Sequence, residues 1–310
     1  MKIYSGSSSQ DLSDSIMQNL DLENSQLSIE KFSDGEILPR FTESIRDEEL
    51  FFIQSTKGSD SIVETLLVID AAKRAGVKSF TLVAPFQGYS RQDKTDHIRS
   101  SIGAKMMSDV LEAVGMNRLI TIDLHSSSIQ GFYNTSVIHL NGNKIFTNYI
   151  KNLELDNIVI CAPDHGALKK NTDFGKAFPN AGFAVINKKR IKPNEIHSME
   201  LIGDVRGKNV IIVDDMCDTA GTLCKAAELL KKSGATSVRA IATHGLLSGP
   251  AIDNINNSVL TEIIVSDTLS DVYEKQAYCS KLVVISCSNL LSNAIERLNK
   301  NISIHELNLV

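Results

Sequence analysis

Short apolar runs alternate with amphipathic stretches along almost the whole chain of 310 residues. The runs FFIQ, FTLVA, LITIDL, NIVICAP, GFAVI, NVIIVDD, SVRAIATH, EIIVSD and LVVIS have the length and composition of buried strands. Between several of them lie stretches with helical spacing, such as residues 60–76 and 101–115. Strands that alternate with helices are typical of a mainly parallel sheet flanked by helices. The sequence therefore predicts an α/β fold.

A repeat suggests how this fold is organised. Residues 51–86 align with residues 211–244: each segment has an apolar strand, a polar loop, a helix that ends at a glycine, and a second strand. The repeat fits generic α/β structure or two domains of one fold. We expect two similar domains, which are residues 1–145, joined by the C-terminal helix 288–300, and residues 146–287.

Charge and cysteine usage exclude several classes of protein. A net charge of −5 disfavours binding of nucleic acid through a broad basic face. The five cysteines are scattered and form no CxxC pair, as in reduced cytosolic proteins. We see no signal peptide and no apolar run of membrane length. We expect a cytoplasmic protein that binds neither nucleic acid nor a membrane.

The loop after the apolar run 210–213 combines two kinds of ligand-binding group. Asp214 and Asp215 come first, and the small residues of Asp218-Thr219-Ala220-Gly221-Thr222 precede a helical run. Hydroxyl groups and bare backbone at a helix start suit a terminal phosphate. Carboxylates accept hydrogen bonds from vicinal hydroxyls or bind a metal ion. A sugar phosphate such as ribose 5-phosphate meets both demands.

Motifs spread over nearly the whole chain resemble those of the ribose-phosphate pyrophosphokinase family, within the type I phosphoribosyltransferase fold. They are FSDGE (32–36), GYSRQD (88–93), DLHSSSIQGF (123–132), APDHGA (162–167), NKKR (187–190), GDVRGKNVIIVDDMCDTAGT (203–222) and THGLLSGPA (243–251). The resemblance implies two phosphoribosyltransferase-like domains and a transferase that serves nucleotide biosynthesis. It also implies that the chain makes 5-phosphoribosyl 1-diphosphate and AMP from ATP and ribose 5-phosphate.

The resemblance assigns the remaining sites. The residues expected to bind ATP are Phe32, Asp34, Gly35, Glu36, Arg91 and Gln92. The residues expected to bind ribose 5-phosphate are Arg190 and the loop residues Asp214, Asp215, Asp218, Thr219, Ala220, Gly221 and Thr222. His125 and Asp164 are the expected Mg²⁺ residues, and Asp164 is the better ligand because Mg²⁺ prefers oxygen.

Catalysis is expected in a cationic loop over residues 187–194, where the resemblance makes Lys188 and Arg190 catalytic. Diphosphoryl transfer needs charge neutralisation more than covalent chemistry, so cations and Mg²⁺ are the expected tools. Family members are usually dimers assembled into hexamers, which implies a homo-oligomer.

The chain departs from the family pattern at several positions, and other functions stay open. Ser100-Ser101 replace Glu-Pro in a regulatory segment, His165 and Ala167 fall within the PDxGG motif, and Asn134 and Ile191 replace an aspartate and a proline. One alternative is a phosphoribosyltransferase that consumes the diphosphate product. Another is a catalytically silent regulatory subunit, because motifs alone do not prove turnover.

Overall fold

The computed structural model describes residues 1–23, 25, 27–95, 97–192 and 195–308; within 188–192 and 195–198, and at 308, it describes the backbone alone. The chain divides into two compact units. The first comprises Met1–Asn141, Thr268–Ser270 and the segment from Cys287 onward, and the second comprises Gly142–Asp267 and Asp271–Ser286. Among the described residues, no helix combines the length and apolar character that a membrane span requires.

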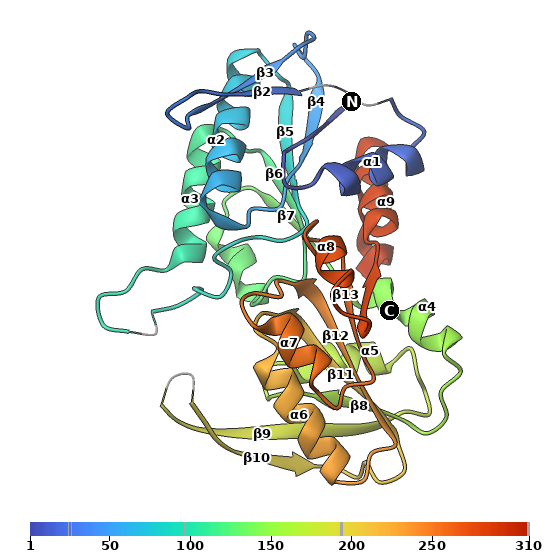
Figure 1. The fold of residues 1–310 in the computed structure, drawn as a ribbon. Helices are drawn as coiled ribbons and strands as arrows, with labels where there is room; N and C mark the ends of the chain where they lie inside the picture. Colours follow the sequence, from blue (N-terminus) through green and yellow to red (C-terminus); the bar gives the residue numbers. More distant parts are fainter. Residues whose placement is uncertain (24, 26, 96, 193–194, 309–310) are drawn as a thin grey trace. The chain divides into compact units, whose positions relative to one another are not determined.

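The first unit is built on a parallel sheet in the order β1-β4-β5-β6-β7 (Figure 1). Helices α2 and α3 lie on one side of this sheet, and α1 packs with α9 on the other. A separate antiparallel hairpin, β2–β3, contacts α2. The elements are β1 (Lys2–Ser5), α1 (Gln10–Asn19), β2 (Leu27–Lys31), β3 (Ile37–Phe41), β4 (Glu49–Ile53), α2 (Gly58–Arg74), β5 (Ser79–Ala84), α3 (Gly103–Val114), β6 (Arg118–Ile122), η1 (Ser127–Phe132), β7 (Ser136–Leu140), α9 (Ser288–Asn299) and η2 (His305–Asn308).

The second unit has the sheet order β10-β9-β8-β11-β12-β13-β14, in which every pair except β9–β10 is parallel. Its apolar core joins α4 and α5 to alternate residues of the central strands, such as Ile211 and Val213. The elements are α4 (Asn143–Asn152), β8 (Ile158–Ala162), α5 (Leu168–Gly175), β9 (Gly182–Lys192), β10 (Glu195–Ile202), β11 (Asn209–Cys217), α6 (Gly221–Lys232), β12 (Ser237–Gly245), α7 (Ala251–Asn256), β13 (Glu262–Ser266), α8 (Val272–Gln276) and β14 (Leu282–Ile285).

The two sheets have the same topology, which extends the repeat seen in the sequence. Strands β1, β4, β5, β6 and β7 correspond in order and direction to β8, β11, β12, β13 and β14, and each unit inserts a hairpin after its first strand and helix. Every apolar run expected to be a strand overlaps one. The predicted α/β fold with parallel sheets flanked by helices is confirmed.

The match between the units extends to single hydrogen bonds. Asp47 and Gly207 both have left-handed backbone, with φ of 61° and 69°. The N–H of each donates to the carbonyl oxygen of the glycine that ends the following helix, Gly76 or Gly234, at 2.9 Å in both units. Both helix-ending glycines have positive φ, as the left-handed cap requires. Counting from these turns along β4 and β11, Gln54 occupies the position of Asp214.

The structure corrects one expectation from the sequence, the loop over residues 187–194. Strand β9 continues through Asn187 to Lys192 and pairs with β10, so that Asn187 lies opposite Glu200 and Lys192 opposite Glu195. The antiparallel neighbour supplies hydrogen-bond partners for the backbone of this polar segment, which keeps it extended. Residues 193 and 194 lie outside the described part of the chain.

A partly exposed network around the carboxylate of Glu112 fastens α3 to the segment before β7. One oxygen of Glu112 accepts from the N–H groups of Asn134 and Thr135 at 2.6 and 2.7 Å and from the Thr135 hydroxyl at 2.9 Å. The other accepts from Asn134 Nδ2 at 2.9 Å. An aspartate at position 134, as in the family pattern, would place a second carboxylate beside Glu112. Burial opposes ionisation of Glu112, but these hydrogen bonds outweigh it and lower its pKa.

We predict that Glu112→Gln lowers the free energy of unfolding by on the order of 1–2 kcal/mol at pH 7, because the neutral amide binds these donors less strongly. The lowered pKa means that this contribution is present above the pKa of the unfolded chain and disappears as the pH falls through the folded-state pKa. Urea titrations of both proteins at pH 7 and pH 3 test this. Asp109→Asn, at an exposed position of the same helix, is the control. An equal difference between the two proteins at both pH values would contradict the assignment.

Candidate active site

The predicted phosphate loop lies at the carboxyl end of β11, between its parallel neighbours β8 and β12. Ligands of open parallel sheets collect at this edge. Asp214 and Asp215 lie in the last part of β11, and α6 begins at Gly221. The structure therefore brings the two carboxylates and the start of the helix into one short segment.

The start of α6 presents unpaired backbone donors. The first bond within the helix runs from Cys224 N to Ala220 O at 2.9 Å, so the N–H groups of Gly221, Thr222 and Leu223 have no partner inside the helix. Ala220 is buried and left-handed, with φ of 60°. The hydroxyls of Thr219 and Thr222 add donors beside these amides. Together with the helix dipole, this arrangement favours an anion.

Three carboxylates crowd the other part of the site. Burial, together with the adjacent charges of Asp215 and Asp164, raises the pKa of Asp214 to about 8. The N–H of Asp215 donates to Asp214 Oδ1 at 3.0 Å. The second unit thus brings Asp164, from the turn after β8, beside the pair on β11. Such a cluster gains free energy from a cation or from hydroxyl donors.

Helix α5 supports this strand end through two residues that the sequence analysis did not single out. Lys170 Nζ donates to the carbonyl oxygen of Asp214 at 3.0 Å and to Thr243 Oγ1 at 2.9 Å. Asn171, which is fully buried, donates through Nδ2 to the carbonyl oxygen of Val213 at 2.7 Å. The sequence held one signal for Lys170: this lysine lies in the first turn of a helix, where the helix dipole disfavours a cation.

The turn between β8 and α5 tolerates the departure at Ala167. Its φ is −81°, which is ordinary for any L-residue, and its N–H donates to Asp164 Oδ1 at 3.2 Å. A glycine is therefore not required by backbone conformation at this position. The added methyl group leaves the Asp164 turn intact.

The candidate ATP residues belong to two segments of the first unit. Phe32, Asp34, Gly35 and Glu36 form the exposed turn of the β2–β3 hairpin, where Gly35 has φ of 96° and Asp34 Oδ1 accepts from Glu36 N at 3.0 Å. Arg91 and Gln92 lie in the loop between β5 and α3 and are also exposed. The Asp-Gly turn is thus a hairpin connection, with its side chains open to a ligand.

The two expected metal residues lie in different units. His125 is exposed in the turn after β6, where the neighbouring Leu124 N donates to His139 Nε2 at 2.9 Å. Asp164 belongs to the second unit. Their pairing stays a prediction. Within the described ranges, no group of three or more His, Cys, Asp or Glu side chains has the geometry of a metal site.

The candidate catalytic residues Lys188 and Arg190 lie in β9, on the sheet of the second unit, opposite Met199 and Ile196 of β10. Their side chains fall outside the described part of the chain. Their catalytic roles also stay predictions.

The loop of the first unit that matches the phosphate loop binds neighbouring segments through several of its polar groups, while Gln54 Nε2 is buried without a hydrogen-bond partner. Gln54 is fully buried, and its Oε1 accepts from the N–H and the hydroxyl of Ser8 at 3.1 and 2.8 Å. Ser55 N donates to Ser9 Oγ at 3.0 Å, and Ser7 N donates to buried Glu64 at 2.7 Å. The two copies of the loop have diverged in residue type, because uncharged Gln54 stands at the position that Asp214 occupies in the second unit.

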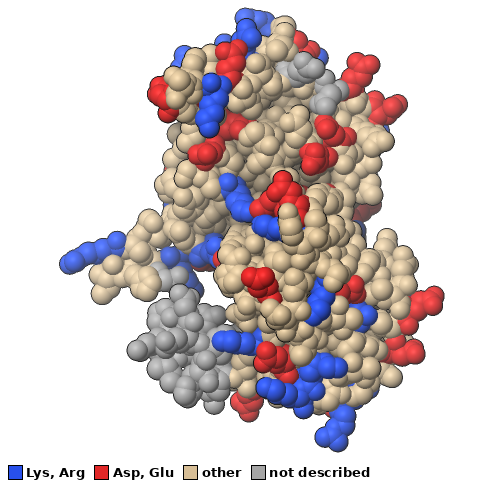
Figure 2. Space-filling model, viewed as in Figure 1, with Lys and Arg blue, Asp and Glu red and all other residues tan. Residues whose placement is uncertain are grey.

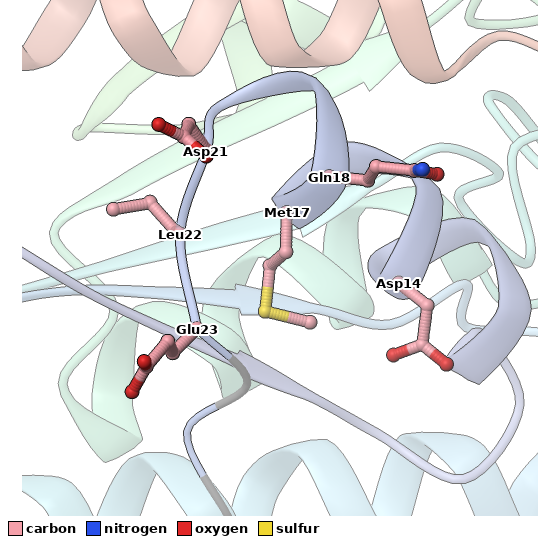
Figure 3. A pocket seen from close by; sticks show the side chains of 6 residues that line it. All are labelled: Asp14, Met17, Gln18, Asp21, Leu22 and Glu23. Atoms are coloured by element: carbon pink, nitrogen blue, oxygen red, sulfur yellow. The ribbon is translucent and has the colours of Figure 1, made fainter.

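A pocket elsewhere in the first unit does not match a phosphate ligand. Its volume is about 500 Å³ and it lies on α1 and the segment that follows (Figure 3). Among the described residues, its lining holds carboxylates, an amide and apolar groups but no cation: Asp14, Met17, Gln18, Asp21, Leu22 and Glu23. Basic and acidic side chains are interspersed over the face drawn in Figure 2, without a broad basic area there.

Comparison with known proteins covers nearly the whole chain. Residues 1–115 match the N-terminal domain of ribose phosphate pyrophosphokinase, and residues 141–308 match the phosphoribosyl synthetase-associated domain. A ribose-phosphate pyrophosphokinase of Porphyromonas gingivalis is 42% identical over 307 residues, which is 98% of this chain and 96% of that protein. One of Aquifex aeolicus is 41% identical over 310 residues, 99% of this chain and 98% of that protein.

A solved structure agrees with these relatives. The crystal structure of phosphoribosylpyrophosphate synthetase from Mycobacterium smegmatis has a TM-score of 0.89 and 34% sequence identity, over 97% of this chain and 99% of that chain. The chain belongs to the ribose-phosphate pyrophosphokinase family, as its motifs predict.

Proposed function

We propose that this chain is a ribose-phosphate diphosphokinase, which transfers the β,γ-diphosphoryl group of Mg-ATP to the C1 hydroxyl of ribose 5-phosphate and releases AMP. The observation that carries the proposal is the free helix start of α6 directly after the carboxylates of β11. The first feature suits the 5-phosphate and the second suits the ribose hydroxyls. Family membership supplies the reaction class.

In this proposal the sugar phosphate lies along the loop of the second unit. The N–H groups of Gly221 and Thr222, with the Thr219 and Thr222 hydroxyls, bind the 5-phosphate. Ala220 leaves room for the backbone to approach, and Asp218 borders the same turn. Asp214 and Asp215 accept from the ribose hydroxyls. Arg190 adds a cation to the same ligand.

ATP and the metal ion are assigned on the family resemblance. The FSDGE turn, Arg91 and Gln92 hold ATP, and Arg91 suits either polyphosphate oxygens or stacking on the base. Asp164 and His125 hold Mg²⁺. The crowded carboxylates around Asp214 fit a hard cation, because its charge relieves their repulsion. When bound, Mg²⁺ neutralises charge on the phosphate chain.

The protein's own residues carry the rest of the mechanism. The loop holds the sugar so that its C1 hydroxyl attacks the β-phosphorus in line. Lys188 and Arg190 stabilise the charge that develops on the transferred group and on the departing AMP. We further propose a cytoplasmic homo-oligomer, dimers assembled into a hexamer, on the family resemblance alone.

The alternative functions have less support. A phosphoribosyltransferase needs no ATP motifs, so the FSDGE and RQD segments and the duplicated first unit count against it. A silent regulatory subunit does not need a loop suited to a phosphate, yet the N–H groups at the start of α6 have no partner inside the helix.

A nucleotide assay of the purified chain with Mg-ATP, with and without ribose 5-phosphate, tests the proposal. We expect AMP only with the sugar, in a one-to-one ratio with phosphoribosyl diphosphate. ADP as the product would indicate a simple kinase and would overturn the proposed transfer. Absence of any nucleotide product would favour the regulatory subunit.

We predict that Lys188→Ala lowers kcat roughly 10²–10³-fold, the scale observed when one preorganised charge donor is lost from a transition state. Steady-state assays with both substrates saturating measure this effect. Lys189→Ala removes the neighbouring charge and is the matched control, with a much smaller expected effect. Unchanged turnover in the Lys188 variant would remove this residue from the mechanism.

We predict that Asp214→Asn stabilises the unliganded chain at pH 8 while it weakens binding of ribose 5-phosphate. The folded chain raises the pKa of Asp214 from its ordinary value of 3.8 to about 8. The free energy of unfolding therefore falls as the pH rises between these two values. Melting temperatures measured in a metal chelator should be higher for the variant by a few degrees at pH 8, roughly 1 kcal/mol for each 2–4 °C. The difference should vanish near pH 4.

The exposed Asp253→Asn on α7 is the control for this experiment and should melt like the unaltered chain at both pH values. A melting temperature of Asp214→Asn that stays below that of the unaltered chain at pH 8 would show that the carboxylates stabilise the fold.

A further inference from the structure

Asn254 of α7 contacts the phosphate loop on both sides of its left-handed turn. Its Nδ2 donates to the carbonyl oxygen of Thr219 at 2.9 Å. Its own backbone carbonyl accepts from Cys224 Sγ at 3.5 Å. Thr219 directly precedes Ala220, and Cys224 lies in the first turn of α6. One residue therefore holds the chain before and after the amides of Gly221 and Thr222.

Three consecutive carbonyls of the loop are anchored on α7 and on the segment that leads into it. Cys217 O accepts from Leu247 N at 3.0 Å, and Asp218 O accepts from Ser248 N at 2.9 Å. Thr219 O accepts from the Asn254 side chain. In a trans peptide the carbonyl and the next N–H point in opposite directions. Anchoring these carbonyls thus fixes the direction of the following N–H groups.

The left-handed conformation of Ala220 needs contacts from outside the loop to maintain it. Ala220 has φ of 60°, a conformation that an L-residue with a Cβ atom adopts only against a steric cost. Strained backbone persists where the surrounding contacts determine it. The first two anchors are backbone bonds, and the third, next to Ala220, depends on a side chain. The Asn254 amide is therefore the contact that a substitution can remove.

We propose that Asn254 is a positioning residue for the phosphate loop. Its side-chain amide keeps the Thr219–Ala220 peptide in the orientation from which α6 starts with its amides directed at the 5-phosphate. The inference rests on the proposed function of the same loop, and assigns to α7 a part in sugar-phosphate affinity.

Asn254→Ala tests this proposal. We expect the KM for ribose 5-phosphate to rise about fivefold to tenfold, the effect of one lost hydrogen bond. The KM for ATP and kcat should stay within about twofold, because the loop contacts only the sugar phosphate. Asn254→Asp has nearly the same shape but cannot donate, so it should raise this KM at least as much.

Asn256→Ala is the matched control. Asn256 lies on the same helix, and its Nδ2 donates to the carbonyl oxygen of Tyr278 at 3.0 Å, away from the phosphate loop. Its loss should leave every KM unchanged. An equal rise in both alanine variants, or an unchanged KM in Asn254→Ala, would overturn the positioning role.

A second readout needs no turnover. Amide hydrogen exchange of the peptide that spans residues 217–224 should be faster in Asn254→Ala than in the unaltered chain and in Asn256→Ala. If the unaltered chain forms no AMP, the proposed function fails, and a calorimetric Kd for ribose 5-phosphate replaces the KM in the same comparison. Unchanged exchange together with an unchanged Kd would overturn the inference by itself.

Discussion

Burial of Asp214 at the end of β11, close to two further carboxylates, is the constraint on which the site depends. Burial and neighbouring charge raise the pKa of Asp214 to about 8, so the unliganded chain holds an unfavourable arrangement. Lys170 and Asn171 of α5 keep this strand end in place, because they donate hydrogen bonds to the backbone carbonyls of Asp214 and Val213. Such a site is preorganised for cations and hydroxyl donors at a cost in folding stability.

The first unit contains a matching loop with which this arrangement of carboxylates can be compared. Both units use the same strand order and the same bond between a left-handed turn and a helix-ending glycine. In the first unit, Gln54 at the position of Asp214 is uncharged and fully buried, and it uses its oxygen on Ser8. The loop of the first unit thus has a neutral side chain where its counterpart before α6 has a carboxylate. One fold thus carries two loops of different residue type at the same position.

Most of the fold could be predicted from the sequence, because buried strands and capped helices leave local patterns. The elements that were missed have weaker patterns: β1 has four residues, β2 and β3 form a partly exposed hairpin, and β7 and β10 carry polar residues. The loop 214–222 could be predicted from its residue types. Lys170 and Asn254 could not, because their roles depend on contacts with segments far away in the chain. Strand β9 continues through the cationic stretch because β10 pairs with it, which residue composition does not reveal.

The measurement that tests the central claim most directly is a crystal structure of the chain with ribose 5-phosphate. The account predicts the 5-phosphate within hydrogen-bond distance of the N–H groups of Gly221 and Thr222, with the ribose hydroxyls toward Asp214 and Asp215. A sugar phosphate bound at the β4–α2 loop of the first unit, or one at the α6 loop with its phosphate turned away from the helix start, would contradict it.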